Sequence, residues 1–318
     1  MRIFVTGATG VVGRRAVPML IAEGHQVVAA GRNLERRAAL ERAGAAVVTL
    51  DLFDRAAVRR AIAGHDVVVN LATHMPPTTL RTMLPGAFRE MDRVRRDGSA
   101  ILSGEAAACG VERFIQESFA PIYADGGDAW LDESAPVRPA RYNRTILDAE
   151  RSAENFSGDG GTGIVLRFAA FYGPDAWHLH DMLKMTRKGW APLPGAANAY
   201  LSSISHDDAA SAVVTALGVP AGIYNVCDDE PVTRRVYFDA LADAFGVPHP
   251  KLLPPWAIHL MGSLGELLGR SERMSNRKLR GHGWAPRYPS VREGFRAVAE
   301  AMGAVGESAG SPSVRAAS

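Results

Sequence analysis

Residues 6–13 read Thr-Gly-Ala-Thr-Gly-Val-Val-Gly, and they follow a short apolar run at residues 3–6. The run predicts a strand, and residues 11–22 have the spacing of an amphipathic helix. Glycines at such a junction let the chain turn sharply and bring backbone N–H groups close to a phosphate at the helix N-terminus. Because a strand precedes the string and a helix follows it, we predict a dinucleotide site here. The alternative is a tight turn without a ligand.

Apolar runs alternate with helical spacing through the first half of the chain. Strands are predicted at 3–6, 26–30, 46–50, 67–71, 114–116 and 164–168, and helices at 11–22, 34–43, 55–63, 88–109 and 146–156. Continuous β-branched runs between amphipathic helices are typical of a parallel sheet covered on both faces. We therefore predict an α/β fold, a Rossmann-like doubly wound parallel sheet.

The pattern changes after Pro174 and returns to strands at 201–205 and 223–227. We predict a dinucleotide-binding domain from residues 1–173 and 201–230, and a smaller interleaved C-terminal substrate lobe from 174–200 and 231–303. Residues 304–318 are small and polar with little to bury, which predicts a flexible tail.

Composition narrows the class of protein. The 318 residues are 47% hydrophobic and 22% charged, with a net charge of +2. The basic residues form no stripe that would neutralise nucleic-acid phosphates. The two cysteines, Cys109 and Cys227, suggest neither a disulfide framework nor a zinc site. No apolar run approaches a membrane span, and the first five residues are too short for a signal peptide. We expect a cytoplasmic protein without a metal, nucleic-acid or membrane partner.

The residue after the second predicted strand bears on the choice of cofactor. An NAD-preferring site normally has an acid there, whereas this chain has Gly31 and then Arg32. A guanidinium can bind a 2′-phosphate through two hydrogen bonds, whereas a carboxylate would repel it. Arg14 is a second candidate for this contact. We predict NADP(H), with NAD(H) less favoured. The alternative for Arg32 is a solvated surface side chain.

Two further strand ends supply candidate cofactor contacts. Asp51 and Leu52 close the third predicted strand, and Leu71, Ala72 and Thr73 close the fourth. Ligands bind at the carboxyl ends of strands in such sheets. Asp51 is expected either to contact the adenine amine or to cap a following turn.

Four more motifs follow in order along the chain. They are Leu-Arg-Phe at 166–168 leading to Tyr-Gly-Pro at 172–174, Ile-Ser-His-Asp-Asp-Ala at 204–209, Gly-Ile-Tyr-Asn-Val at 222–226, and Gly-Trp-Ala-Pro-Arg-Tyr-Pro at 283–289. Together with the glycine-rich turn, they resemble the extended short-chain dehydrogenase/reductase family, which includes nucleotide-sugar epimerases, dehydratases and reductases. The resemblance covers about residues 1–300. It implies a homodimer paired through 88–109 and the Tyr142 helix.

The resemblance also implies a catalytic set that this chain keeps only in part. The family uses a Tyr-x-x-x-Lys pair with an upstream hydroxyl. Tyr142 matches the tyrosine, but Ile146 occupies the lysine position and Phe119 the hydroxyl position. Ser118 lies one residue short and would serve if the alignment shifts by one. Arg95 replaces the asparagine of the family proton relay. Without a cation nearby, Tyr142 should keep a pKa of about 10 and act poorly near neutral pH; the alternative is a packed helix residue.

Replacement proton donors are sought near the expected nicotinamide. His74 and Glu117 rank first, ahead of Arg144, His178 and His180. A histidine has a suitable unperturbed pKa, although a lone loop histidine is more often structural. The predicted catalytic residues are Tyr142, Ser118, His74 and Glu117. The predicted cofactor-binding residues are Thr6, Gly7, Thr9, Gly10, Val11, Val12, Gly13, Arg14, Arg32, Asp51, Leu52, Leu71, Ala72, Thr73 and Tyr142.

These observations predict an NADP(H)-dependent oxidoreductase or epimerase/dehydratase-type enzyme with a degenerate Ser/Tyr/Lys set. The lobe after Pro174 has no clear cluster of Lys and Arg for a nucleotide-sugar diphosphate, so a less charged small organic substrate is expected. Two alternatives remain open. One is a non-catalytic NADP(H)-binding sensor or scaffold, and the other is a non-redox isomerase or cyclase that uses the same pocket.

Overall fold

A parallel sheet of seven strands organises the computed structural model, which describes residues 1–31, 34–74, 86–193, 195–254, 256, 265 and 269–309. The strand order is β11-β7-β5-β4-β1-β2-β3. The strands are β1 (Arg2–Thr6), β2 (Gln26–Ala30), β3 (Ala46–Val48), β4 (Val67–Asn70), β5 (Arg113–Phe119), β7 (Thr162–Phe168) and β11 (Gly222–Val226). The chain order reverses between β1 and β4, and open α/β sheets bind ligands at such a reversal, beyond the carboxyl ends of the strands.

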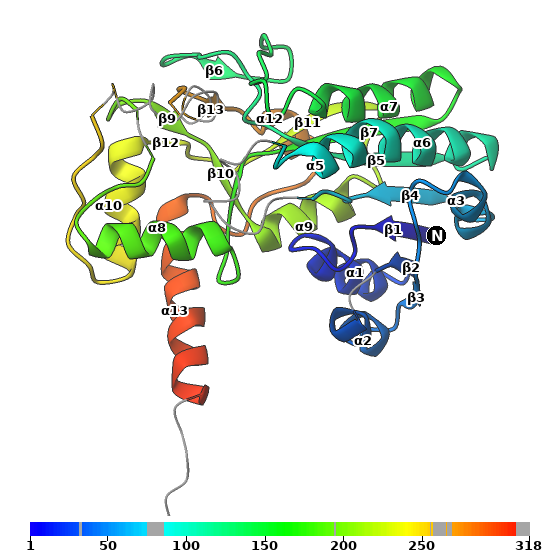
Figure 1. Ribbon diagram of the computed structural model, residues 1–318, viewed down its shortest axis with the longest axis horizontal. Helices are drawn as coiled ribbons and strands as arrows, with labels where there is room; N and C mark the ends of the chain where they lie inside the picture. Colours follow the sequence, from blue (N-terminus) through cyan, green and yellow to red (C-terminus); the bar gives the residue numbers. More distant parts are fainter. Residues whose placement is uncertain are drawn as a thin grey trace, which may run out of the picture.

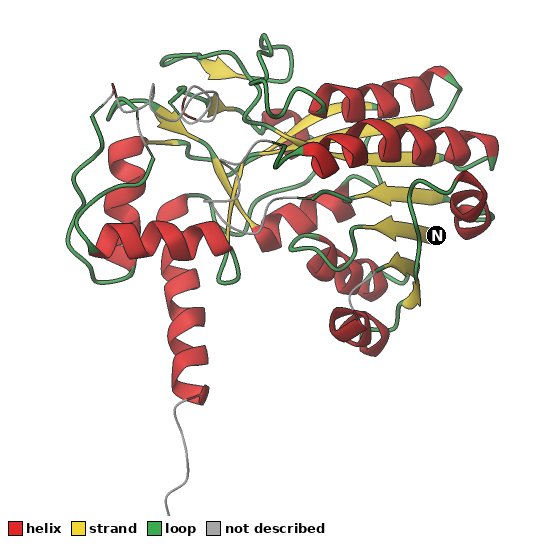
Figure 2. Ribbon diagram, viewed as in Figure 1, coloured by secondary structure: helices red, strands yellow, loops and turns green. Residues whose placement is uncertain are grey.

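Helices cover both faces of this sheet (Figures 1 and 2). Those on one face are α3 (Arg55–Ile62), α6 (Ser99–Ala108) and α7 (Ile146–Gly158); those on the other are α1 (Gly13–Ala22), α2 (Leu34–Arg42) and α9 (His206–Thr215). Successive residues of a strand point to opposite faces, so Phe4 and Val68 join one core while Ile3 and Val67 join the other. The doubly wound α/β prediction is confirmed.

The predicted helix at 88–109 is in fact three consecutive segments. α5 (Arg89–Arg93) leads into a π-helical turn, η1 (Val94–Gly98), and then into α6. A π-turn widens the helix and alters which side chains face inward, and such turns are frequent at functional sites. Here Arg95 lies in the wide turn and is only 4% exposed.

A second group of elements packs beside the sheet, on the left in Figure 1. It has its own core, which includes Tyr172, Leu179, Phe238 and Phe295. Its helices are α8 (Trp177–Arg187), α10 (Arg234–Ala244) and α13 (Val291–Ala309), and α12 (Arg277–Arg280) lies against β11. Its short strand pairs are β8 (Ala170–Tyr172) with β10 (Ser203–Ser205), β9 (Tyr200–Leu201) with β12 (Val232–Thr233), and β6 (Trp130–Leu131) with β13 (Arg273–Met274).

Several predicted boundaries differ from the structure, and in two places the element itself changes. The single strand expected at 201–205 is divided at Ser202, because Tyr200–Leu201 pairs with β12 whereas Ser203–Ser205 pairs with β8. Helix α13 continues to Ala309, so residues 304–309 are helical although their composition predicts a tail. Gly303 precedes them but keeps a helical backbone, and a helix already packed on a core can extend from its end.

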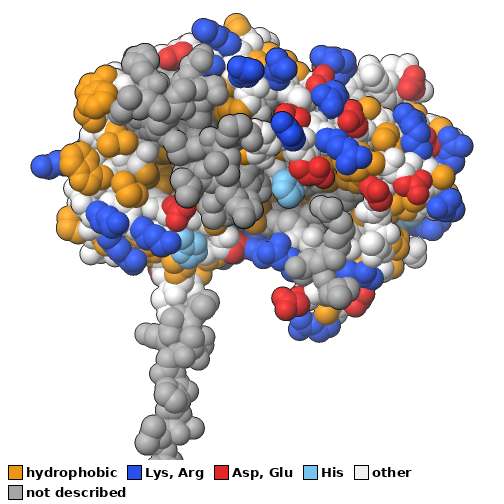
Figure 3. Space-filling model, viewed as in Figure 1, with side chains coloured by type: hydrophobic (Ala, Val, Ile, Leu, Met, Phe, Trp, Pro, Cys, Tyr) orange, Lys and Arg blue, Asp and Glu red, His pale blue; other side chains and the backbone are white. Residues whose placement is uncertain are grey.

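Figure 3 shows Lys and Arg side chains interspersed with Asp and Glu side chains on one face of the molecule. Hydrophobic side chains gather at its left edge. Large exposed hydrophobic side chains in the structure include Met185, Trp190 and Trp256. Among the helices described, none combines the length and apolar character needed to cross a membrane.

Candidate active site

The turn between β1 and α1 is built so closely that two glycines cannot be replaced without a clash. Gly7 has φ +64°, and a Cβ added there would lie 2.1 Å from the Leu71 carbonyl oxygen. A Cβ on Gly13 would lie 2.4 Å from the Gly7 carbonyl oxygen. The turn is therefore pressed against the carboxyl end of β4 on one side and folded onto itself on the other.

This turn presents free backbone donors at a helix N-terminus. The Gly10 amide donates to the Gly7 carbonyl at 2.9 Å, and the Arg14 amide donates to the Gly10 carbonyl at 3.1 Å. Within the described part of the chain, the amides of Val11, Val12 and Gly13 have no recorded acceptor. The first turn of α1 carries no acidic side chain. The turn formed by residues 6–13, called the cradle below, thus fits the diphosphate of a dinucleotide, which such a turn binds through its amides and the helix dipole.

A buried amide network fixes the strand ends beside the cradle. The Thr6 hydroxyl donates to Asn70 Oδ1 at 2.6 Å, and Asn70 Nδ2 donates to Gln116 Oε1 at 2.8 Å and to Ser99 Oγ at 3.1 Å. These bonds join β1, β4, β5 and α6 at one edge. The Thr6 hydroxyl is thus engaged within the protein, and a contact between Thr6 and the cofactor stays a prediction.

Arg14 and Arg15 at the start of α1 are engaged by acids from distant segments. Arg14 and Arg15 both pair with Asp175, and Arg15 Nε also lies 2.6 Å from Asp207 Oδ1. Burial, followed by the neighbouring cations Arg15 and Arg36, lowers the pKa of Arg14. A cofactor contact by Arg14 would require it to exchange Asp175 for the phosphate, so that role stays a prediction.

Arg32 lies outside the described residues, so its predicted contact with a 2′-phosphate is not addressed by the structure. Its neighbour Gly31 approaches the turn, since a Cβ there would lie 2.8 Å from Thr9 Cγ2. Arg36 also reaches the turn, with Nη1 donating to the Thr9 carbonyl at 3.1 Å. Sequence reasoning did not single out Arg36, although its place on the first turn of α2 could have suggested it.

The other predicted cofactor contacts lie at strand ends as expected. Asp51 is exposed and its Oδ1 accepts from the Phe53 amide at 3.0 Å, so the turn-capping alternative is realised while its second oxygen is left for other contacts. Leu52 and Ala72 are half-buried, Leu71 is buried, and Thr73 is exposed. His74 is also exposed, and its ring makes no hydrogen bond within the described chain.

Ser118 points to the α7 face of the sheet. Its hydroxyl donates to Glu150 Oε1 at 2.6 Å, and its side chain is fully buried. Glu150 Oε2 in turn pairs with Arg167 Nη2 at 2.7 Å. The hydroxyl is thus engaged in the protein interior. A catalytic role for Ser118 stays a prediction, and this contact argues against it.

The Glu150 and Arg167 pair belongs to a buried network that explains two of the sequence motifs. Arg167 Nη1 donates to the Tyr123 hydroxyl at 3.0 Å, and this hydroxyl donates to Asn225 Oδ1 at 2.7 Å. Glu150 raises the pKa of Arg167 in spite of its burial, and burial raises the pKa of Tyr123 to about 12. Arg167 and Asn225 therefore hold β7 and β11 to the rest of the core.

Tyr142 lies in the turn that precedes α7, where its ring packs 4.8 Å from the ring of Phe88. It is partly exposed. Burial raises the pKa of its hydroxyl above the ordinary value, with Arg95 and Arg270 opposing the shift and Glu272 adding to it. Ile146 at the family lysine position is fully buried. The hydroxyl is thus a weaker acid than an ordinary tyrosine.

Glu117 and Arg95 are buried charged groups near this tyrosine. Glu117 is 7% exposed and its Oε2 has no hydrogen-bond partner, while Arg95 Nε and Nη1 have none either. The two side chains influence each other electrostatically but do not form an ion pair. Burial raises the pKa of Glu117 despite the opposing effect of Arg95.

Two more residues approach Tyr142 from the second group of elements. Burial raises the pKa of Glu272 to about 8, against the effect of Arg270. Arg270 Nη1 donates to the carbonyls of Tyr123 and Arg138. Sequence reasoning missed both, and no local motif marks them, because their proximity to Tyr142 comes from tertiary packing.

The remaining histidine candidates have backbone partners. His178 Nε2 lies 2.6 Å from the Phe171 carbonyl, and His180 Nε2 lies 2.9 Å from the Pro174 carbonyl. Burial lowers the pKa of His178. These contacts give both rings a structural place at the start of α8. Arg144 is exposed.

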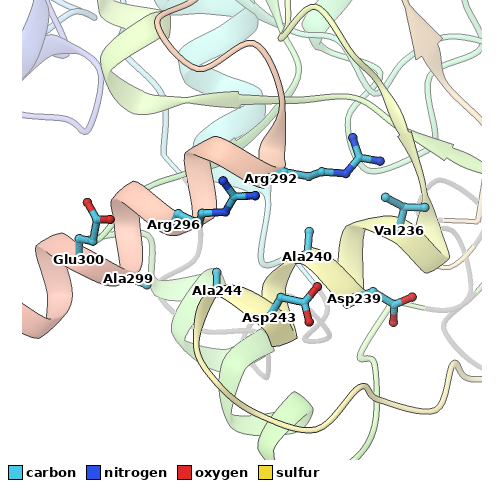
Figure 4. Close-up of a pocket in the computed structure, with 9 residues that line it drawn as sticks. All are labelled: Val236, Asp239, Ala240, Asp243, Ala244, Arg292, Arg296, Ala299 and Glu300. Carbon is cyan, nitrogen blue, oxygen red and sulfur yellow. The ribbon is translucent and has the colours of Figure 1, made fainter.

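A groove of about 530 Å³ runs between α10 and α13 (Figure 4). It is lined by Asp239 and Asp243 from α10 and by Arg292, Arg296 and Glu300 from α13. None of the predicted site residues lines it. The chemistry described above is accordingly elsewhere, at the carboxyl ends of β1, β4 and β5.

Comparisons with known proteins agree with this geometry. A family model described as NAD(P)H-binding matches residues 7–158. A 3-diazoavenalumate denitrifying reductase from a Streptomyces species is 34% identical over 310 residues, which cover 93% of this chain and 99% of the relative. A 4-hydroxy-2-methyl-3-oxo-4-farnesyl-3,4-dihydroquinoline-1-oxide ketoreductase from Stigmatella aurantiaca is 28% identical over 283 residues, covering 85% of this chain and 81% of the relative.

Among solved structures, the human epimerase family protein SDR39U1 with NADPH superposes with a TM-score of 0.78 at 20% identity. The match covers 94% of this chain and 99% of that one. At this level of identity, the likeness concerns the fold alone.

Proposed function

This chain belongs to the extended short-chain dehydrogenase/reductase family and has an NAD(P)H-binding domain, and from that premise we propose that it is an NADP(H)-dependent reductase that replaces a diazo group of a small organic acid by hydrogen. One observation carries the proposal. The glycine-rich cradle is intact, whereas the groups that would deliver a proton through Tyr142 are missing or engaged elsewhere. The relative that matches nearly the full chain is named for loss of a diazo group.

The type of acceptor follows from the proton requirement. A ketone needs a hydride at carbon and a proton at oxygen, and a tyrosine whose pKa is raised delivers that proton poorly near neutral pH. An arenediazonium ion needs a hydride only. The bound nicotinamide would supply that hydride with its electron pair. The carbon–nitrogen bond breaks, dinitrogen leaves, and the carbon keeps the hydrogen. One diazonium cation and one NADPH thus give one arene, one dinitrogen and one NADP+.

In this proposal the chain's own residues bind and orient the cofactor and the substrate. The amides of Val11, Val12 and Gly13 hold the diphosphate, and Arg32, with Arg14 released from Asp175, holds the 2′-phosphate. Residues 1–173 and 201–230 bind the cofactor, and 174–200 and 231–303 cover the substrate. Holding two reactants in one orientation contributes much of the rate of such a transfer. We also propose a homodimer paired through residues 88–109 and the Tyr142 helix, which light scattering would test.

The test uses NADPH carrying deuterium at C4 and 3-diazoniobenzoate as the acceptor. We expect enzyme-dependent loss of absorbance at 340 nm, release of one dinitrogen per NADPH, and deuterium on the ring carbon of the benzoate formed. Reactions without enzyme, and with Gly13 changed to Ala, measure background reduction. No acceleration over these controls would refute the proposed reaction.

Ketone reduction is the second candidate, and Glu117 favours it. A buried carboxyl group with a raised pKa can donate a proton where Tyr142 does not. The Stigmatella relative is named a ketoreductase. A 3-oxo acid assayed beside the diazonium compound separates the two functions. If the ketone is reduced and Glu117→Gln abolishes that reaction, Glu117 is the acid and the ketone is the substrate.

A further inference from the structure

Arg95 is a buried arginine without the partners that such a residue usually has. It lies in the π-helical turn η1 and is 4% exposed, and within the described chain its Nε and Nη1 make no hydrogen bond. Arg167 is equally buried but donates to both oxygens of Glu150. Burying a charge without a hydrogen-bonded partner costs free energy. The protein supplies such a partner for Arg167 but not for Nε and Nη1 of Arg95.

The acids near Arg95 leave its donors available. Glu117 has an unpartnered Oε2 but forms no ion pair with Arg95, and Asp92 Oδ1 accepts the Thr145 hydroxyl at 2.7 Å. Burial favours the neutral form of Glu117, whose pKa is raised. The surroundings of Arg95 therefore contain a cation with free donors and a carboxyl group that is not hydrogen-bonded to it.

We propose that Arg95 anchors a carboxylate of the substrate and that the enzyme consequently selects small organic acids over their neutral analogues. Arg95 lies in η1, which packs against α7, and the partly exposed Tyr142 lies in the turn before α7 with its ring against that of Phe88. The charge of Arg95 also acts on the Tyr142 hydroxyl. An aromatic acid would lay its ring near that pair and direct its carboxylate to the guanidinium. The assignment rests on the proposed function for the reacting end of the substrate.

The donor chemistry favours a carboxylate over a phosphate. A planar guanidinium matches the two oxygens of a carboxylate and can bind them with charge-assisted hydrogen bonds. A phosphate dianion would bring more charge than the guanidinium of Arg95 alone balances. Arg95 points inward from η1, whereas the next residue, Arg96, pairs with Asp97 at the surface.

The experiment is equilibrium binding, which does not depend on turnover. Isothermal titration calorimetry of the NADP+-loaded protein is carried out with cinnamate and with cinnamamide, which share a ring and differ in charge. The variants are Arg95→Met, Arg95→Lys and, as the matched control on the same turn, Arg96→Met. We expect Arg95→Met to weaken cinnamate about tenfold or more and cinnamamide less than about twofold, since bonds to a charged group are the stronger ones. Arg95→Lys should keep the preference for the acid, and Arg96→Met should match the wild type.

Equal weakening of both ligands by Arg95→Met, or no effect on either, would overturn the assignment. If Arg95→Met does not fold, the wild-type protein decides, because equal affinity for acid and amide also overturns it. A preference for the acid that depends on Arg95, together with no reduction of any diazo compound, would refute the proposed reaction and leave the anchor standing.

Discussion

Alanine at Gly7 should damage the protein more than alanine at another glycine of the same backbone conformation. Gly7 and Gly24 both have positive φ, at +64° and +83°. Nothing lies within 4 Å of a Cβ added to Gly24, whereas a Cβ on Gly7 would lie 2.1 Å from the Leu71 carbonyl oxygen and 2.7 Å from the Ala72 amide nitrogen. The two substitutions share the cost of the left-handed conformation, and only Gly7→Ala adds a clash with backbone.

The expected magnitudes follow from these two contributions. The left-handed conformation costs an L-residue roughly 1–2 kcal/mol, which is the whole effect expected for Gly24→Ala. Overpacking typically adds about 1–3 kcal/mol, so Gly7→Ala should lower the free energy of unfolding by roughly 2–5 kcal/mol. Because the clash pushes the turn away from β4, Gly7→Ala should also weaken NADPH binding at least about tenfold, a factor that corresponds to about 1.4 kcal/mol.

Urea unfolding at constant pH measures the first quantity, and calorimetric titration with NADPH measures the second. Gly24→Ala controls for the conformation, since it lies just beyond α1 and away from the cradle. Equal losses of stability in the two variants would refute the packing argument. Unchanged NADPH affinity in a folded Gly7→Ala protein would refute the assignment of this turn to the cofactor.

Three further substitutions test the buried groups. Ser118→Ala removes the donor to Glu150 and should lower the free energy of unfolding by about 1–3 kcal/mol in urea, with kcat/KM within threefold of wild type; a hundredfold loss of kcat/KM without loss of stability would make Ser118 catalytic. Arg167→Met leaves Glu150 buried and unpaired and should cost about 3–5 kcal/mol, whereas adding Glu150→Gln should recover part of it; no recovery in the double variant would contradict a charge effect. Burial raises the pKa of Glu272 from 4.5 to about 8. Between these two pH values the folded protein holds a proton that the unfolded chain has released. The stability that this group contributes is therefore complete below about pH 4.5 and is lost as the pH rises to about 8. Compared with Glu272→Gln, the wild type should lose on the order of 1 kcal/mol per pH unit across that window, and parallel stability curves would exclude the titration.

Local pattern was sufficient for the sheet. A strand buried on both faces is a continuous apolar run, and a helix on its surface repeats every three to four residues, so both periods can be read from neighbouring residues. The cradle is equally local, because positive φ at Gly7 and helical backbone from Gly13 depend on residues adjacent in sequence. The prediction that the family's lysine is replaced is of the same local kind, because it rests on Ile146 lying four residues after Tyr142.

The state of the charged groups was not local. Ser118 was a candidate hydroxyl by its place in the chain, but the Glu150 carboxylate that engages it comes from α7 and is itself held by Arg167 on β7. The sequence suggests that Arg14 can bind a phosphate, whereas the structure pairs it with Asp175. Such pairings depend on which elements meet across the sheet and between the two cores.

The sequence alone therefore predicted the strands of the sheet and the phosphate turn, because each depends on residues a few positions apart. Only the tertiary structure decided which acids and cations are paired, that Arg95 is buried in the π-helical turn, and that Glu272 approaches Tyr142. The physical reason is the distance along the chain between the residues that interact. Backbone conformation is set by near neighbours along the chain, whereas desolvation and charge pairing are set by near neighbours in space.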